Sequence, residues 1–139
     1  MSYDLQKFKD AQKKDYETAL MEVRCGRKRS HWIWYIFPQI EGLGMSAISQ
    51  YYAIADLEEA RAYLRDSYLK GHLIQISEAL LDLSTSNPTE VFGKPDDMKV
   101  RSCMTLFHIA DPNIKVFEEV LVKFYEGKMD QRTLDILEV

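Results

Sequence analysis

Two tryptophans two positions apart, Trp32 and Trp34, are the side chains best suited to bind a planar ligand. In an extended segment both indoles would share a face and flank one ring; in a helix they lie about 200° apart, and only one would face a pocket. The same aromatic segment continues to Gln39, whose amide is able to bind a base edge or a ribose. We therefore predict ligand-binding roles for these three residues, with packing in the core as the alternative for both indoles.

A glycine-rich turn follows the aromatic segment. Gly42 and Gly44 flank a leucine, and glycine lets the backbone come close to a ligand. Ser46 is expected to cap a short helix that runs to Tyr52, and the N–H groups at the start of a helix attract anions. The turn lacks both the strand–GxGxxG–helix context and a Walker lysine, so it indicates phosphate binding only weakly. We predict that both glycines and Ser46 contribute to the same site.

A later helix carries a second set of ligand-binding candidates. Lys99, Ser102 and Thr105 recur every three residues, and one lysine beside small hydroxyls suits a phosphate or a sugar. One alternative is a solvent-exposed face with an ion pair between Asp97 and Arg101. Another is that the hydroxyls bond back to their own helix. The ligand-binding prediction is made for Lys99 and Ser102.

Two carboxylates are the candidates for catalysis. Glu41 is the acid that follows the aromatic segment, and Asp96 lies one helical turn before Lys99. Either would polarise an attacking water, and a carboxylate beside an anomeric carbon stabilises the charge that develops during N-glycoside hydrolysis. The histidines share no spacing, so no nucleophilic triad is predicted.

Composition and charge exclude several function classes. The chain has 139 residues, of which 46% are hydrophobic and 29% charged, as expected for one folded domain over residues 1–139. The net charge of −4 argues against nucleic acid as a partner. Cys25 and Cys103 are isolated, so we expect no metal site and no cofactor.

Membrane insertion is not expected either. The longest apolar run, from Trp32 to Pro38, is far shorter than the ~20 residues that span a bilayer. The charged N-terminal segment does not resemble a signal peptide. These features predict a cytoplasmic protein, and the oligomeric state is left open.

The elements that position these groups are predicted to be helices. Apolar residues recur at steps of three and four, and Gly and Pro separate the segments. Asp4, Asp56 and Asp130 are predicted to cap helix starts, with Glu59 completing a capping box with Asp56. Residues 30–40 have no clean period, and a helical turn or short helix is favoured there because no partner strand is visible. The other predicted helices cover residues 4–24, a short segment to 52, 56–64, 67–83, a turn over 88–93, 96–109, 111–125 and 130–137. The prediction is an all-α fold, a compact single-domain multi-helix bundle.

Four segments resemble a known family. They read HWIWYIFPQIEGLG, YAIADLEEARAYL, VFGKPDDMKVRSCMTLF and FYEGKMDQRTLDIL. Together they resemble the bacterial and fungal family numbered 1810 among the domains of unknown function, over about residues 4–137. The resemblance implies a helical fold and assigns no activity. Some members carry the label calpastatin, although calpastatins are long, disordered chains and this composition is that of a folded globule.

A fainter similarity is to the NADAR (NAD- and ADP-ribose-associated) family, whose members resemble small helical N-glycosidases. It rests on the aromatic segment, the spacing of Ser46 and Tyr51, and a later helix that ends at Leu106-Phe107. It implies a nucleotide-derived ligand of the ADP-ribose or phosphoribosyl type, which the chain would bind or hydrolyse.

Two alternatives remain for the aromatic stretch. Residues 31–52 would either anchor a non-catalytic protein-interaction module or serve the core alone. A cavity of about 300 Å³ or more, lined by these residues, would favour the ligand.

Overall fold

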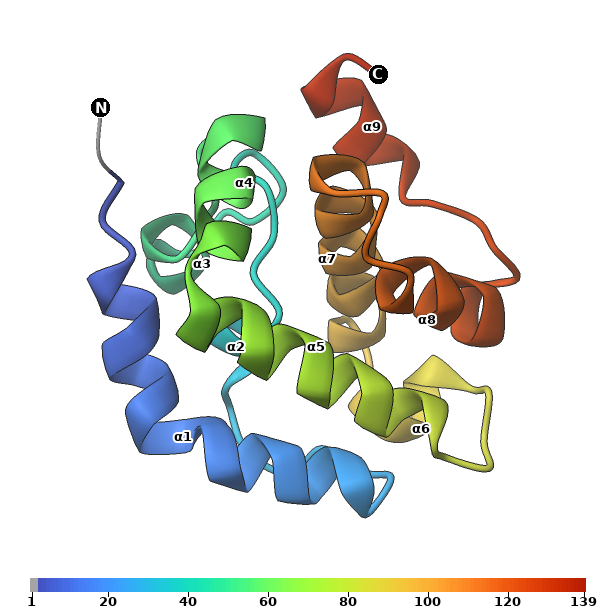
Figure 1. The fold of residues 1–139 in the computed structure, drawn as a ribbon. Coiled ribbons are helices and arrows are strands. Elements are labelled where there is room, and N and C mark those ends of the chain that lie inside the picture. Colours follow the sequence, from blue (N-terminus) through green and yellow to red (C-terminus); the bar gives the residue numbers. More distant parts are fainter. Residues whose placement is uncertain (1–2) are drawn as a thin grey trace.

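The computed structural model describes residues 3–139, and over that range the chain folds into nine helices (Figure 1). Met1 and Ser2, with which the predicted domain begins, lie outside the described residues. The helices are α1 (Gln6–Arg24), α2 (Ile33–Ile36), α3 (Ala47–Tyr51), α4 (Leu57–Arg65), α5 (Ser67–Leu81), α6 (Pro88–Phe92), α7 (Asp96–Ala110), α8 (Val116–Tyr125) and α9 (Gln131–Leu137). The prediction of an all-α fold is confirmed.

Side-chain caps determine where most of these helices begin. Asp56 accepts a hydrogen bond from the N–H of Glu59 at 2.8 Å, and the Glu59 carboxylate accepts one from the N–H of Ala55 at 2.6 Å. This reciprocal pair resembles the predicted capping box. The remaining side-chain caps, at the starts of α3, α5, α6 and α9, are Ser46, Asp66, Asn87 and Asp130.

Two predicted helix starts were wrong. Asp4 does not cap α1, whose N-cap residue is Leu5. The helix expected from residue 111 begins at Val116 instead, because the Asp111 carboxylate accepts a hydrogen bond from the N–H of Asn113 at 3.1 Å and shapes a turn. A short polar side chain of this kind competes with helix formation by bonding to nearby backbone.

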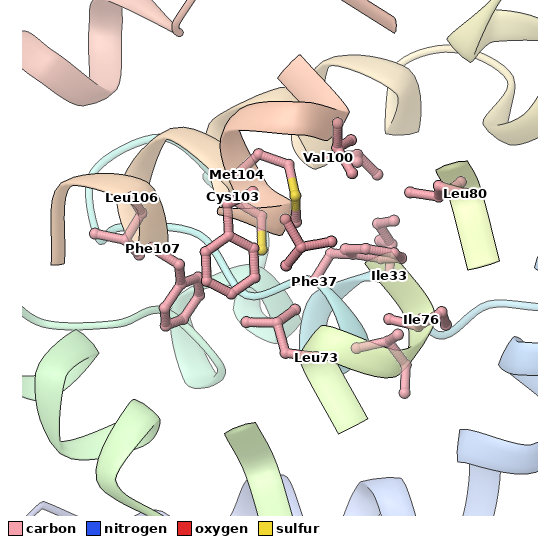
Figure 2. Packing of buried hydrophobic residues seen from close by; sticks show 14 of the residues in the cluster. Ile33, Phe37, Leu73, Ile76, Leu80, Val100, Cys103, Met104, Leu106 and Phe107 are labelled. Atoms are coloured by element: carbon pink, nitrogen blue, oxygen red, sulfur yellow. The ribbon is translucent and has the colours of Figure 1, made fainter. Parts of the chain in front are cut away.

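Helix α7 is the central element of the fold. It packs against α2, α4, α6, α8 and α9, while α5 lies between α1 and α8 (Figure 1). Nine of the fifteen residues of α7 are buried. Figure 2 shows where its side chains meet those of α2 and α5, with Phe37, Leu73, Ile76, Met104 and Phe107 among the residues of this cluster. The apolar area removed from water here is what stabilises the arrangement.

A buried carboxylate joins the end of α1 to the aromatic segment. Glu22 accepts hydrogen bonds from the backbone N–H of Arg29 (2.8 Å) and of Ser30 (2.9 Å), from Ser30 Oγ (2.6 Å) and from Trp32 Nε1 (2.9 Å). Burial alone would raise the pKa of this carboxyl, but the hydrogen bonds outweigh burial and lower the pKa from 4.5 to about 2. The segment that leads into α2 is therefore held by a charged group.

A pair of backbone hydrogen bonds closes the loop that follows α2. The N–H of Glu41 donates to the carbonyl of Ile54, and the N–H of Ile54 donates to the carbonyl of Gln39, both at 2.8 Å. This short parallel bridge fixes the two ends of the glycine-containing segment. None of the helices within residues 3–139 is long and apolar enough to cross a membrane.

Candidate ligand site

The candidate site is a cavity of about 380 Å³ at the start of α7. Three parts of the chain form its walls: the loop 39–49, the first two turns of α7 with the residue before it, and the start of α9. The lining residues are Gln39, Leu43, Gly44, Ser49, Pro95, Met98, Lys99, Ser102, Asp130 and Arg132. Its volume is larger than the ~300 Å³ expected for a small-molecule site.

Close packing of the glycine loop against α3 shapes one wall. A Cβ atom on Gly44 would lie 2.4 Å from the Cβ of Ser49, so no residue larger than glycine fits there without displacing the loop. Ser46 is the N-cap of α3, because its Oγ accepts a hydrogen bond from the N–H of Ser49 at 3.2 Å. The Oγ atoms of the two serines are also hydrogen-bonded to each other.

Lys99 belongs to a network of two lysines, one carboxylate and two tryptophans. Its Nζ lies 3.2 Å from Asp96 Oδ1 and 5.5 Å from the ring centre of Trp34. The other carboxylate oxygen of Asp96 lies 3.0 Å from the Nζ of Lys28, which sits 5.2 Å from the ring centre of Trp32. Two ammonium groups share one carboxylate, so the network keeps an excess positive charge.

The second cation of the cavity is Arg132. Its side chain is exposed and forms no hydrogen bond or ion pair with any other residue in the range 3–139. A guanidinium offers five donors in a fixed planar arrangement that matches phosphate and carboxylate groups. Arg132 is therefore free to bind an anion that enters the cavity.

The acidic group of the cavity is Asp130, the N-cap residue of α9. Its Oδ2 accepts hydrogen bonds from the N–H (2.9 Å) and the Oγ1 (2.7 Å) of Thr133. Its own N–H donates to Thr105 Oγ1 at 2.9 Å, which fixes α9 to the middle of α7. Asp130 is 9% exposed.

Four predicted ligand-binding residues meet in this cavity: Gln39, Gly44, Lys99 and Ser102. The Ser102 hydroxyl donates to the carbonyl of Met98 at 3.1 Å, so it bonds back to its own helix, and Ser102 also lines the cavity. For Ser102, both the back-bond to its own helix and the predicted position in the site are therefore found.

Trp34 lies beside the cavity and does not line it. It borders a smaller pocket of about 10 Å³ that shares Gln39, Gly44 and Ser49 with the larger one. The ammonium of Lys99 already lies over its ring. A ring that carries a cation on its face positions that cation, so Trp34 holds Lys99 in place. That a ligand stacks on Trp34 stays a prediction.

Trp32 is a core residue, contrary to the prediction of a ligand-binding role. It is 1% exposed, and its Nε1 donates to Glu22. The two indoles cannot flank one ring, because the segment that follows Trp32 is helical and turns their side chains apart.

Glu41, Gly42 and Ser46 lie outside the cavity, although the sequence placed them in the site. Glu41 and Gly42 are exposed, and Gly42 has a φ of 104°, which favours glycine for conformational reasons alone. Ser46 is exposed and serves as the cap of a five-residue helix. Asp96, the other predicted catalytic acid, does not line the cavity either and touches it through Lys99.

The predicted ion pair between Asp97 and Arg101 does not form. Asp97 is buried and accepts a hydrogen bond from Thr89 Oγ1 at 2.6 Å. Arg101 donates instead to the carbonyls of Lys128 (2.8 Å) and Met129 (3.0 Å), so it holds the segment that leads to Asp130. The helix face for which solvent exposure was the alternative thus contacts the C-terminal segment.

Sequence reasoning missed Asp130 and Arg132 as site residues. The capping role of Asp130 was predicted and is confirmed, and it gave a complete explanation for an acid at that position. The isolated arginine two residues later carried no local pattern. Only the packing of α9 against α7 brings both to Lys99.

Comparison with known proteins identifies the family. The family model described as "Protein of unknown function (DUF1810)" matches residues 2–137. The chain belongs to this family. The resemblance to the family numbered 1810 is thereby confirmed, whereas the fainter similarity to the NADAR family stays a prediction.

A solved structure with the same fold is that of the conserved hypothetical protein Rv1873 from Mycobacterium tuberculosis. The two chains are 41% identical and superpose with a TM-score of 0.96, over 99% of this chain and 98% of the other. A comparison with curated proteins gave no match.

Proposed function

We propose that this chain binds a small phosphate-bearing ligand of the nucleotide-derived type in the cavity at the start of α7. The observation that carries the proposal is a pair of cationic side chains, Lys99 and Arg132, in a cavity whose other walls include Leu43 and Met98. Cations beside apolar walls suit a ligand that has both an anionic group and a less polar body.

The local charge supports an anionic ligand. Lys28, Lys99 and Arg132 are opposed by Asp96 and Asp130, so the region is positive although the whole chain has a net charge of −4. A positive concave site in an acidic protein concentrates small anions without attracting a nucleic acid backbone.

The cavity volume favours the smaller of the two ligand types suggested by the sequence. Sites for small molecules span about 300–1,000 Å³, and the value of about 380 Å³ is near the lower end. A phosphoribosyl group fits this volume better than ADP-ribose. The proposal concerns binding and names no reaction, because neither of the predicted catalytic acids, Glu41 and Asp96, lines the cavity.

Calorimetric titration with ribose 5-phosphate tests the proposal. We expect the wild type to bind it, and Lys99→Ala and Arg132→Ala to bind at least about tenfold more weakly, because a hydrogen bond to a charged group contributes about 1.5–3 kcal/mol. Lys14→Ala is the matched control, since Lys14 is exposed on α1 and forms no ion pair or hydrogen bond with another described residue.

The same titration is repeated with ADP-ribose, NAD and free bases. Absence of heat with every compound, while all four proteins are folded by circular dichroism, would sink the proposal. Equal affinity in the wild type and both site variants would do the same.

A second candidate function is a protein-interaction module, and the exposed apolar side chains around α3 favour it. Met45 is 85% exposed, Tyr51 57% and Ile48 38%. Apolar groups gathered on one short segment are typical of a contact surface. If this is the function, Met45→Asp would abolish capture of a partner that Lys14→Ala retains, and no small ligand would bind.

A further inference from the structure

We propose that Asp130 accepts a hydrogen bond from a hydroxyl group of the bound ligand, so that the cavity selects phosphorylated polyols over phosphates without hydroxyls. This inference rests on the proposed function, because it concerns the same cavity. It adds the chemical class of the ligand body and a residue that determines specificity.

The first observation is that Asp130 is held rigidly. Its backbone N–H is bound by Thr105 Oγ1, and its Oδ2 receives both the N–H and the hydroxyl of Thr133. A residue held by three hydrogen bonds, two of them to its side chain, keeps its orientation with little loss of entropy when a ligand binds. Asp130 is therefore preorganised to present its other oxygen.

The second observation is that this other oxygen, Oδ1, has no partner. No residue in the range 3–139 donates a hydrogen bond to it, although Asp130 as a whole is only 9% exposed. Oδ1 is not fully enclosed, because within residues 3–139 the side-chain atom that is both fully enclosed and without a hydrogen-bond partner is His108 Nδ1. Oδ1 of Asp130 therefore keeps access to solvent, and the space that Asp130 borders is the cavity.

The cations of the cavity do not neutralise Asp130. Neither Lys99 nor Arg132 forms an ion pair with it, and the carboxylate partner of Lys99 is Asp96. A ligand that enters the cavity displaces the solvent that reaches Oδ1, and a carboxylate oxygen buried without a donor is unfavourable, so a ligand that supplies a donor is favoured. The cations Lys99 and Arg132 and the acceptor Asp130 thus line the same cavity.

The charge of the cavity decides which donor fits. An ammonium group would meet repulsion from Lys99 and Arg132, whereas a hydroxyl donates a hydrogen bond without carrying charge. The amide of Gln39, which makes no hydrogen bond with any described side chain, offers a further polar contact. A phosphate on a body with several hydroxyls matches all of these groups.

The test compares ribose 5-phosphate with propyl phosphate by calorimetry. Propyl phosphate has the same anionic group and no hydroxyl. We expect the wild type to bind ribose 5-phosphate at least about tenfold more tightly. In Asp130→Asn the amide oxygen takes the place of Oδ2 on Thr133, because asparagine is an equally good cap, and the amide nitrogen takes the place of Oδ1.

The variant thus replaces an acceptor by a donor in the cavity. We expect ribose 5-phosphate to bind Asp130→Asn at least about tenfold more weakly, and propyl phosphate to bind as well as before or better, because a negative charge has been removed. Asp135→Asn is the matched control on the same helix, exposed and outside the cavity, and should bind both compounds like the wild type.

The outcomes separate the two proposals. If neither compound binds the wild type, the proposed function and this inference are both overturned. If both bind the wild type equally, or if Asp130→Asn keeps its affinity for ribose 5-phosphate, this inference alone is overturned and the anion site stands. Should the variant not fold, the comparison of the two compounds on the wild type decides the matter.

Discussion

At the scale of single residues, Glu22 shows how a charged group can stabilise a buried segment. Its carboxylate lies in the core, where charge is unfavourable, yet four donors from residues 29–32 surround it. Because Trp32 is one of these donors, the same group fixes the start of α2. Helix α2 in turn carries Trp34, which holds Lys99 at the cavity.

The lowered pKa of Glu22 predicts a pH-dependent stability. A carboxyl whose folded pKa is lowered from 4.5 to about 2 contributes stability that is complete above pH 4.5 and is lost as pH falls toward 2. We expect Glu22→Gln to lose about 1–3 kcal/mol of unfolding free energy at pH 7, the usual cost of weakening hydrogen bonds to a charged group, and the difference from wild type to shrink between pH 4.5 and 2.

Urea unfolding at several pH values measures this difference. Glu78→Gln is the matched control, because Glu78 is exposed on α5 and forms no hydrogen bond or ion pair with another described residue. It should stay within about 0.5 kcal/mol of the wild type at every pH. If the difference in unfolding free energy between Glu22→Gln and the wild type did not change with pH, the lowered pKa of Glu22 would be contradicted.

At the scale of the elements, local signals were enough to predict most helices. Asp56, Pro88 and Asp130 stand at helix starts because capping and the fixed φ of proline act within one turn of the chain. The start of α8 was predicted wrongly at residue 111 because of a local interaction of the same kind. The Asp111 carboxylate bonds to the nearby backbone in a turn as readily as in a helix cap.

The candidate site was only partly predictable for a different reason. Gln39 and Lys99 were chosen for their chemistry, and both line the cavity. Trp32 was chosen on the same grounds and is buried, because the sequence does not state which face of a short helix meets the core. Asp130 already had a local explanation, and its second role depends on how α9 packs against α7.

The contact between the glycine loop and α3 yields a prediction at this scale. In Gly44→Ala the added Cβ would meet the Cβ of Ser49 at 2.4 Å, so the loop must move away from α3. We expect a loss of about 1–3 kcal/mol in unfolding free energy, the usual cost of overpacking, together with weaker binding of ribose 5-phosphate.

The matched control is Gly71→Ala, in the exposed middle of α5. No atom lies within 4 Å of a Cβ at Gly71, so alanine should raise the unfolding free energy by about 0.5–1 kcal/mol. Thermal unfolding followed by circular dichroism compares the two variants. Equal stability of both would show that the loop does not rest on α3 as described.

At the scale of the whole molecule, the cavity joins three segments that are far apart in the sequence. The loop 39–49 is closed by its bridge, the start of α7 is held by the core, and Arg101 and Thr105 fix the segment before α9. Each wall is thus attached to the rest of the fold by its own contacts. A ligand that touches all three walls links them, and the amides of all three should open less often.

Hydrogen exchange with and without ribose 5-phosphate measures this linkage. With the ligand bound, we expect the backbone amides of residues 39–49, 95–102 and 128–134 all to exchange more slowly. The amides in the middle of α1, which lies outside the cavity, should not change. Lys99→Ala at the same ligand concentration should show much less protection in all three segments, because one of the two anion contacts is lost. Protection confined to one segment would mean that the ligand binds at a single wall and that the cavity is not its site.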